Sequence, residues 1–231
     1  MTKRKIEYWV IPPEANGEFV AGMEDVLETY EKAYDPSLPV ICMDEQPVQL
    51  VGETRVPIPA TKEHPERVDY EYERCGTASI FMFAEPLSGF RQATARDQRT
   101  KVDWALEVAN LLDTRYVDHE KVILVCDNLN THTRGAFYEA FSPEKAREYI
   151  HRIEFVYTPK HGSWLNIAEC ELSCLTRQCL ADRRIDSLNR LQSEIKAWSK
   201  AINTKQRGVD WQFTIEKARA KLKRLYPKIK T

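Results

Sequence analysis

The sequence has no hydrophobic run long enough to span a membrane, and this absence excludes integral membrane proteins with helical spans. A transmembrane helix needs about 18 or more mostly apolar residues in a row, and no stretch of the 231 residues approaches that length. The basic residues of the opening segment MTKRKIEYWVIPPE are not followed by the long apolar segment of a secretory signal. We therefore predict a cytoplasmic protein with no membrane partner.

Cysteine pairs of the kind that bind structural zinc are also missing. The six cysteines include no CxxC pair, which argues against the common zinc-binding spacings. Cys42 and Cys126 lie within apolar runs, where a reduced cysteine behaves as a small buried hydrophobe. Reduced thiols suit a reducing compartment, in agreement with a cytoplasmic location.

Low-complexity tracts and repeats of fixed period are absent as well, which predicts one principal globular domain. The formal net charge is -1 at pH 7, so the overall charge does not indicate a nucleic-acid partner. The charge is nevertheless uneven, because acids dominate residues 14–45 and bases dominate residues 200–231. A basic end can contact a phosphate backbone, although a charge run is more often a solvated surface.

The hydrophobic pattern predicts an α/β fold with a mixed sheet flanked by helices. Continuous apolar runs predict buried strands, and apolar residues three or four positions apart predict helices. After one N-terminal helix, the order is three strands, a helix, a strand, a helix, a strand and further helices. We expect strands within 39–45, 77–95 (two strands around the turn EPLSG), 121–128 and 153–159, and helices within 21–34, 100–116, 142–152, 163–180, 187–202 and 214–226. Residues 51–67, rich in proline and charge, are expected to form an excursion outside the core.

Two aspartates follow apolar strands in positions that suit a metal site. Asp44 and Asp127 each close a predicted buried strand, and reactive groups in open α/β sheets gather beyond the carboxyl ends of strands. If the two strands are parallel neighbours, the carboxylates share a small space and repel each other. Mg²⁺ would supply the missing charge, and a third acid from a helix would complete a two-metal site for a phosphodiester. The alternative is that each aspartate only begins a turn.

The predicted helix after residue 163 offers two candidates for the third acid. At about 100° per residue, its buried stripe consists of Leu165, Ala168, Leu172, Leu175 and Cys179. Glu169 and Glu171 flank this stripe on opposite edges. The helical pattern does not choose between them.

The segments CMDE, VCDNLNTH and TPKHGSWLNIAECELS together resemble the DDE transposases of bacterial insertion sequences, in the Tc/mariner superfamily and its IS-six-thirty group. The likeness extends from about Trp9 to Tyr226. In that family the catalytic acids are the aspartate of the first motif, the aspartate of the DN motif and the glutamate that closes SWLN-x-x-E. These correspond here to Asp44, Asp127 and Glu169, so the resemblance selects Glu169 over Glu171.

The resemblance implies a ribonuclease H-like fold and DNA strand cleavage and strand transfer with two Mg²⁺ or Mn²⁺ ions held by the three acids. It implies transposon ends and target DNA as partners, and a dimer in the active complex. Family members normally begin with helix-turn-helix modules, and none precedes Glu14. The resemblance therefore leaves three alternatives: one product of a split gene, with a partner chain that carries these modules, a truncated copy, or an excised domain. We divide the chain into an N-terminal extension with a helix (1–36), the catalytic domain (37–182) and C-terminal helices with a basic tail (183–231). The rival hypotheses are an inactive DNA-binding or assembly remnant and another ribonuclease H-type nuclease.

Residues near the motifs complete the expected site. The basic turn in front of the helix and the basic tail are expected to contact DNA phosphates, through Lys160, His161, Gly162, Lys217, Lys221 and Arg224. Supporting roles are expected for Asn128, His132 and Asn166, although a purely structural turn is an alternative for the first two. We also expect Glu171→Gln to leave cleavage nearly unchanged, in contrast to Glu169→Gln.

Overall fold

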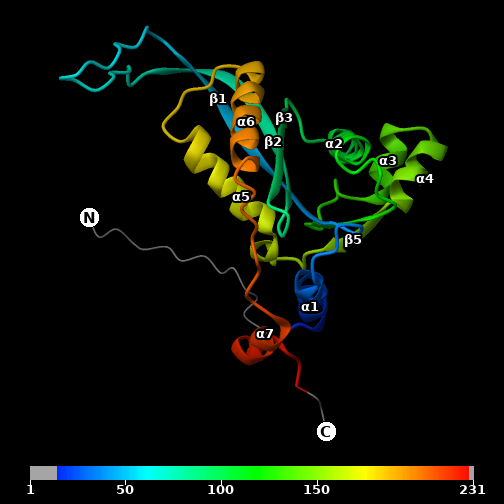
Figure 1. Cartoon of the computed structure of the whole chain (residues 1–231). Coiled ribbons are helices and arrows are strands. Elements are labelled where there is room, and N and C mark those ends of the chain that lie inside the picture. The colour runs from blue at the N-terminus through cyan, green and yellow to red at the C-terminus, as the bar shows by residue number, and fades with distance from the viewer. Residues whose placement is uncertain (1–14, 229–231) are drawn as a thin grey trace.

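A computed structural model describes residues 15–228 of the chain, and its centre is a five-stranded sheet (Figure 1). The strand order is β3-β2-β1-β4-β5. β1 pairs antiparallel with β2, β2 pairs antiparallel with β3, and β4 and β5 run parallel to β1. The predicted mixed sheet is therefore confirmed. The strands are β1 (Val40–Glu53), β2 (Tyr72–Glu85), β3 (Phe90–Arg96), β4 (Val122–Cys126) and β5 (Ile153–Tyr157).

The strands that carry the two aspartates are adjacent and parallel, as predicted, but β1 does not end at Asp44. It continues to Glu53 because the equally long β2 stays paired with it beyond the end of β4. Pro47 is tolerated in this second half of β1, opposite Ser79 of β2. A proline lacks the N–H for a second partner, and β4 no longer lies on that side.

The segment between β1 and β2 projects from the sheet as a long ribbon (Figure 1). Part of the predicted excursion is therefore wrong, since residues 51–53 belong to β1. The remainder forms a turn region held by one bridge between Ile58 and Arg67. Arg184 fastens its base, because it pairs with Glu53 at 2.6 Å and donates to the backbone oxygens of Glu71 and Asp69.

The helices begin at residues that satisfy their first backbone N–H groups. Asn16 accepts a hydrogen bond from the N–H of Phe19, so the first helix starts four residues before its predicted range. Thr100 forms a capping box with Asp103. The helices are α1 (Gly17–Glu31), α2 (Lys101–Thr114), the unpredicted α3 (Arg134–Ala140), α4 (Pro143–His151), α5 (Ile167–Leu175), α6 (Leu188–Asn203) and α7 (Ile215–Lys221). Within residues 15–228, no helix combines the length and apolarity needed to cross a membrane.

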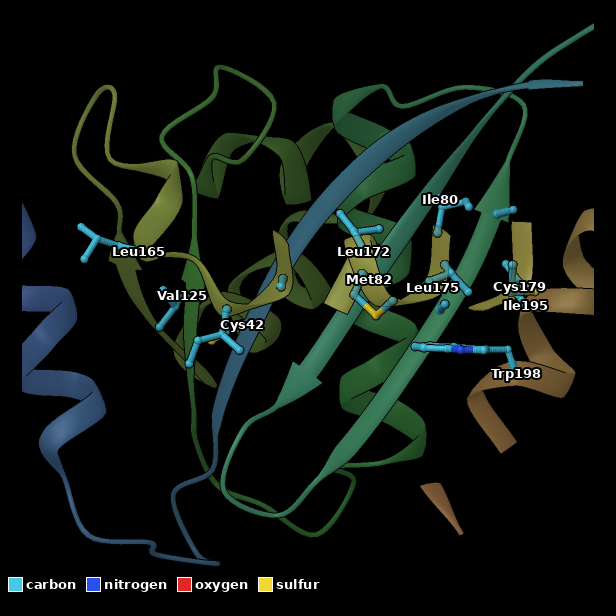
Figure 2. Close-up of a cluster of buried hydrophobic side chains, with 14 of the residues drawn as sticks. Cys42, Ile80, Met82, Val125, Leu165, Leu172, Leu175, Cys179, Ile195 and Trp198 are labelled. Atoms are coloured by element: carbon cyan, nitrogen blue, oxygen red, sulfur yellow. The ribbon is translucent and has the colours of Figure 1, made fainter. Parts of the chain in front are cut away.

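Two hydrophobic cores lie on opposite faces of the sheet. On the first face, Cys42, Leu172 of α5 and Ile195 of α6 belong to one extended hydrophobic cluster (Figure 2). On the second face, Ile41 and Met43 pack with residues of α2, α3 and α4. Neighbouring residues of one strand thus belong to opposite cores, as strand geometry requires. The same alternation determines the face of the sheet on which a polar side chain lies when it follows the apolar part of a strand.

Side chains of α6 cover the free edge of β3. Ser199 Oγ accepts a hydrogen bond from the N–H of Ala93 at 3.3 Å, and the Asn203 side chain bonds both the N–H and the carbonyl of Arg91 at 2.8 and 2.7 Å. Unpaired backbone groups on an edge strand invite pairing with other chains. The C-terminal helix α6 therefore completes the sheet and protects its edge.

The acidic N-terminal helix and the basic C-terminal segment pair with each other. Arg219 of α7 makes two hydrogen bonds to the Glu24 carboxylate, at 2.8 and 2.9 Å, and Tyr226 donates to the same group. Glu31 accepts the N–H of Ile215 at 2.6 Å. Part of the uneven charge seen in the sequence is therefore neutralised within the fold.

Candidate active site

Asp44 and Asp127 lie at the same level of two neighbouring strands. Cys42 stands opposite Val125 in the parallel register of β1 and β4, so the residues two positions further along are also level. Cys42 and Val125 both belong to the first core. Because side chains alternate along a strand, Asp44 is directed to that same face, which α5 covers, whereas Asp127 lies just beyond the end of β4 and its carboxylate contacts His132.

Asn166 brings Glu169 to this pair. Its buried side chain caps α5 by accepting the N–H of Ala168 at 3.1 Å, and its Nδ2 donates to the carbonyl of Met43 at 2.8 Å. Met43 directly precedes Asp44, so the start of α5 is tied to the strand at the level of the first aspartate. Glu169 is the third residue of α5, where the helix dipole stabilises a negative charge.

Burial and neighbouring carboxylates influence the ionisation of Asp44. Burial is the main reason that the pKa of Asp44 is raised to about 7. The N–H of Glu45, which donates to Asp44 Oδ1 at 2.7 Å, opposes this shift, and the charges of Asp127 and Glu169 raise the pKa further. The site thus concentrates more negative charge than the protein alone compensates.

A buried histidine holds the second aspartate from the opposite side. His132 Nδ1 lies 2.5 Å from Asp127 Oδ1, and its Nε2 lies 3.0 Å from Glu45 Oε1. Its ring stacks on Trp104 with centroids 5.3 Å apart. Burial lowers the pKa of His132, but the contacts with the two carboxylates outweigh it and raise the pKa to about 9. His132 is therefore an imidazolium at neutral pH that fixes the position of Asp127.

Glu45 is a site residue that the sequence reasoning missed. Its side chain is 3% exposed and pairs with His132, while Asp44, one position earlier, faces α5. Two successive acids at the end of an apolar strand run must point to opposite faces. That alternation was a usable signal in CMDE, but the partner of Glu45 lies 87 residues further along the chain and cannot be located from local spacing.

A sequence profile of the DDE superfamily endonucleases matches residues 39–192, which is more than half of the chain. The chain belongs to this family. The matched segment of the endonuclease contains Asp44, Asp127 and Glu169, together with Glu45 and His132. No curated protein matches the chain.

The endonuclease is similar in fold to solved Mos1 mariner transposases. It is 16% identical to the catalytic domain of Mos1 mariner transposase, with a TM-score of 0.54, and the match covers 86% of this chain and 91% of that one. It is 18% identical to the Mos1 mariner paired end complex with Mn (TM-score 0.53, 90% of this chain), and spans only 63% of that protein's length. A pre-cleavage Mos1 transpososome gives 17% identity, a TM-score of 0.56, and coverage of 98% and 68%. The ribonuclease H-like fold expected from the sequence is therefore confirmed.

The donor set of the endonuclease suits a hard divalent cation. Carboxylate oxygens are the ligands that Mg²⁺ prefers, and Asp127 Oδ1 is buried without a hydrogen bond, since its contact with His132 is an unaligned ion pair. Among residues 15–228, no group of three or more His, Cys, Asp or Glu side chains is already assembled closely enough to hold a metal.

Glu171 does not have the place that the sequence predicted for it. It is buried rather than at an exposed edge of α5, and it pairs with Arg91 of β3 at 2.7 Å. Arg91 also donates to the backbone oxygens of Gly89 and Arg207. The expectation that Glu171→Gln leaves cleavage nearly unchanged stays a prediction for folded protein, but the change should lower stability, because it leaves a buried guanidinium without its counter-ion.

The basic turn before α5 is separated from the helix by a short 3₁₀ turn, Ser163–Leu165. Lys160 and His161 are exposed, and His161 has a positive φ of 65°. Gly162 is required there because a Cβ would meet Pro159 at 2.6 Å. Since Asn166 already caps α5, this turn offers an exposed cation rather than free helix N–H groups, and its contact with DNA stays a prediction.

Three of the remaining expected site residues lie in the C-terminal segment, and one directly follows Asp127. Lys217 donates to the carbonyl of Gln212 at 2.6 Å, and Lys221 lies in the same α7. Arg224 follows in the turn Lys223–Leu225. Asn128 is exposed in the loop after β4. Their predicted roles stay predictions.

The pKa of Asp44 gives a stability prediction. The pKa of Asp44 is about 7 in the folded state and near 4, its ordinary value, in the unfolded state. At a pH between these two pKa values, the folded state therefore binds more protons than the unfolded state. Stability from this group is therefore present at low pH and is lost as the pH rises toward 7. We expect Asp44→Asn to stabilise the metal-free endonuclease at about pH 8 by on the order of 1–3 kcal/mol, since water still screens the partly exposed group.

Chemical denaturation of wild type and variant at about pH 4 and pH 8 measures this effect. The exposed Asp97→Asn, in the turn after β3, is the matched control and should change stability at neither pH. Equal stability of Asp44→Asn and wild type at the higher pH would show that neither burial nor the neighbouring acids penalise the charged Asp44 carboxylate in the fold.

Proposed function

We propose that this DDE endonuclease is the catalytic domain of a transposase that cuts DNA at the ends of an insertion sequence and joins those ends to a target. One observation carries the proposal: Asp44 and Asp127 follow neighbouring parallel strands at the same level, and the Asn166 side chain ties the start of α5, the helix of Glu169, to the carbonyl of Met43. We assign the chain to the IS-six-thirty group of the Tc/mariner superfamily, on the likeness of its CMDE, VCDN and SWLN motifs.

The proposal includes partners and location. The Mos1 structures of similar fold are a strand transfer complex and paired end complexes with Mn and with Mg, which supports DNA ends and divalent metal as ligands. A dimer in the active complex and a separate chain carrying helix-turn-helix modules are further parts of it. A cytoplasmic location agrees with six free cysteines in the fold.

Each residue of the site has a defined task in this reaction. Asp44 and Asp127 would hold two divalent metal ions, and Glu169 of α5 would be a ligand of the second ion. When bound, two Mg²⁺ or Mn²⁺ ions supply activation of the attacking oxygen and stabilisation of the leaving oxygen of a phosphodiester. His132 holds the Asp127 carboxylate in place, and Asn166 keeps the start of α5 at the level of Asp44.

A comparison of substrates tests the proposed function. The purified chain is incubated with supercoiled plasmid, a four-way junction and an RNA:DNA hybrid, with Mg²⁺, with Mn²⁺ and with EDTA. We expect metal-dependent nicking of the plasmid and little preference for the junction or the hybrid. Preference for the junction or the hybrid would identify another ribonuclease H-type nuclease, and folded protein without any cleavage would support an inactive remnant.

We expect the chain alone to bind DNA weakly, with little sequence preference and a strong dependence on salt. Specific ends are read by recognition helices in the major groove, whereas exposed cations such as Lys160 contact phosphates and do not read bases. The logarithm of the binding constant falls linearly with the logarithm of the salt concentration, and each neutralised phosphate makes this slope steeper by about 0.9. Lys160→Gln should therefore lower the slope by about that amount for every duplex tested.

Salt titrations with an insertion-sequence end and a scrambled duplex of equal length measure this prediction. The exposed Lys145→Gln, on α4, is the control and should leave the slope unchanged. A preference for the end that persists at high salt would reveal a recognition element within this chain.

A further inference from the structure

A groove runs from the acids along α5 and β1. It has a volume of about 530 Å³ and is lined on one side by Asp44 and Gln46 of β1 and on the other by Glu169 and by residues that follow it. Asp44 and Gln46 share one face of the strand because they are two positions apart. The groove is therefore continuous with the proposed catalytic site and leads away from it.

The helical wall of the groove continues past the end of α5. Glu169, Ser173 and Thr176 follow each other at spacings of four and three, which places them on one face of a helix. Thr176 begins a π-helical turn (Thr176–Leu180), in which the N–H of Ala181 donates to the carbonyl of Thr176 at 2.7 Å. Such turns are frequent at functional sites. The wall thus extends to Arg177, which also lines the groove.

The polar character of the groove changes along its length. Next to the acids, Gln46 and Thr176 join strand to helix through hydrogen bonds of 3.1 and 3.3 Å. This contact forms a neutral polar floor, beside which the hydroxyl of Ser173 is exposed. At the far end stands Arg177, the only cation among the groove's lining residues.

Arg177 is available for an external anion. It is exposed, and within residues 15–228 it makes no hydrogen bond or ion pair. The other arginine just beyond this turn, Arg183, is held by Glu194 at 2.6 Å. A guanidinium presents a planar fork of donors that matches phosphate oxygens. The free fork lies in a groove that begins at Asp44 and Glu169, which suits a chain of phosphates with one of them at those two acids.

We propose that this groove holds the DNA strand next to the bond that is cut, with Arg177 on a flanking phosphate. Eight residues of helix separate Arg177 from Glu169, or about 12 Å at 1.5 Å per residue. Phosphates of one strand rise by about 3.4 Å each along a duplex axis and lie farther apart along the strand itself, so the contacted phosphate lies roughly two to four nucleotides from the cleaved bond. This inference rests on the proposed function, since it takes the acids as the point of cleavage.

Binding to a duplex of about 30 base pairs without divalent metal gives the first test. Arg177→Gln removes the charge and keeps much of the length, so the slope of log K against log salt should fall by about 0.9. The control is Arg147→Gln, exposed on α4, which should leave the slope unchanged. A slope for Arg177→Gln equal to that of wild type overturns the groove proposal.

Neutral methylphosphonates placed singly around a mapped cleavage position give the second test. For wild type, cleavage should slow about ten-fold at one position roughly two to four nucleotides away. Arg177→Gln should be slow on unmodified DNA and show no further loss at that position. Full and equal losses in both proteins at every position overturn the assignment. A further outcome is that Arg177→Gln has the expected lower slope than wild type while wild type never cleaves DNA. In that case the groove assignment holds as a DNA contact and the proposed function fails.

Discussion

Replacing Asp127 by asparagine is expected to reduce metal-dependent DNA cleavage by about 10²–10⁴-fold while the protein stays folded. The amide has nearly the same size but lacks the charge that holds a divalent cation, and metal catalysis is worth several kcal/mol at about 1.36 kcal/mol per factor of ten. Asp44→Asn and Glu169→Gln should cause losses of similar size, because the three carboxylates act on one site. The rate of plasmid nicking, measured on protein with a native circular dichroism spectrum, checks this result.

The matched controls for these variants must lie away from the groove. Asp97→Asn is exposed after β3, and Glu139→Gln on α3 alters a half-exposed carboxylate that pairs with Lys101. Both should cleave within about two-fold of wild type, as expected for surface changes outside the site. If Glu169→Gln retained the activity of these controls, Glu169 would not belong to the catalytic set.

Glu171→Gln should destabilise the fold by about 3–5 kcal/mol, because it leaves the buried Arg91 guanidinium without its counter-ion. Both side chains are less than one-tenth exposed, so water does not replace the lost partner. Guanidinium chloride unfolding measures the loss, and Glu148→Gln, whose side chain is 54% exposed in an ion pair with Lys145, is the control with an expected change below about 0.5 kcal/mol.

A double variant separates the charge effect from packing. Arg91→Met with Glu171→Met removes both charges, so its loss should be smaller than the sum of the two single losses. The carbonyls of Gly89 and Arg207 lose their donor in this variant, so full recovery is not expected. A single-variant loss below about 1 kcal/mol for Glu171→Gln would contradict the buried-pair account.

The local elements of the site were predictable from the sequence. The apolar runs ahead of Asp44 and Asp127 predicted buried strands, and their parallel pairing follows once a helical crossover lies between them. The buried stripe of α5, from Leu165 to Cys179, was also correct. These features depend on periodicity within one segment, which the sequence records directly.

The parts that the sequence did not predict depend on contacts between distant segments. Glu171 looked like a boundary residue because its partner Arg91 lies 80 positions earlier. β1 is longer than predicted because β2 continues to pair with it after Asp44, where the apolar run that predicted the strand ends. The acidic and basic ends looked like separate charged surfaces, yet Glu24 and Arg219 meet in the fold.

Anomalous diffraction from crystals of the endonuclease grown with Mn²⁺ and a short DNA duplex tests the central claim most directly. The account predicts manganese peaks between the carboxylates of Asp44 and Asp127, with Glu169 turned toward them from α5. Manganese bound elsewhere, or held at this edge of the sheet without Asp127, would contradict the assignment of these three acids as the metal-binding catalytic site.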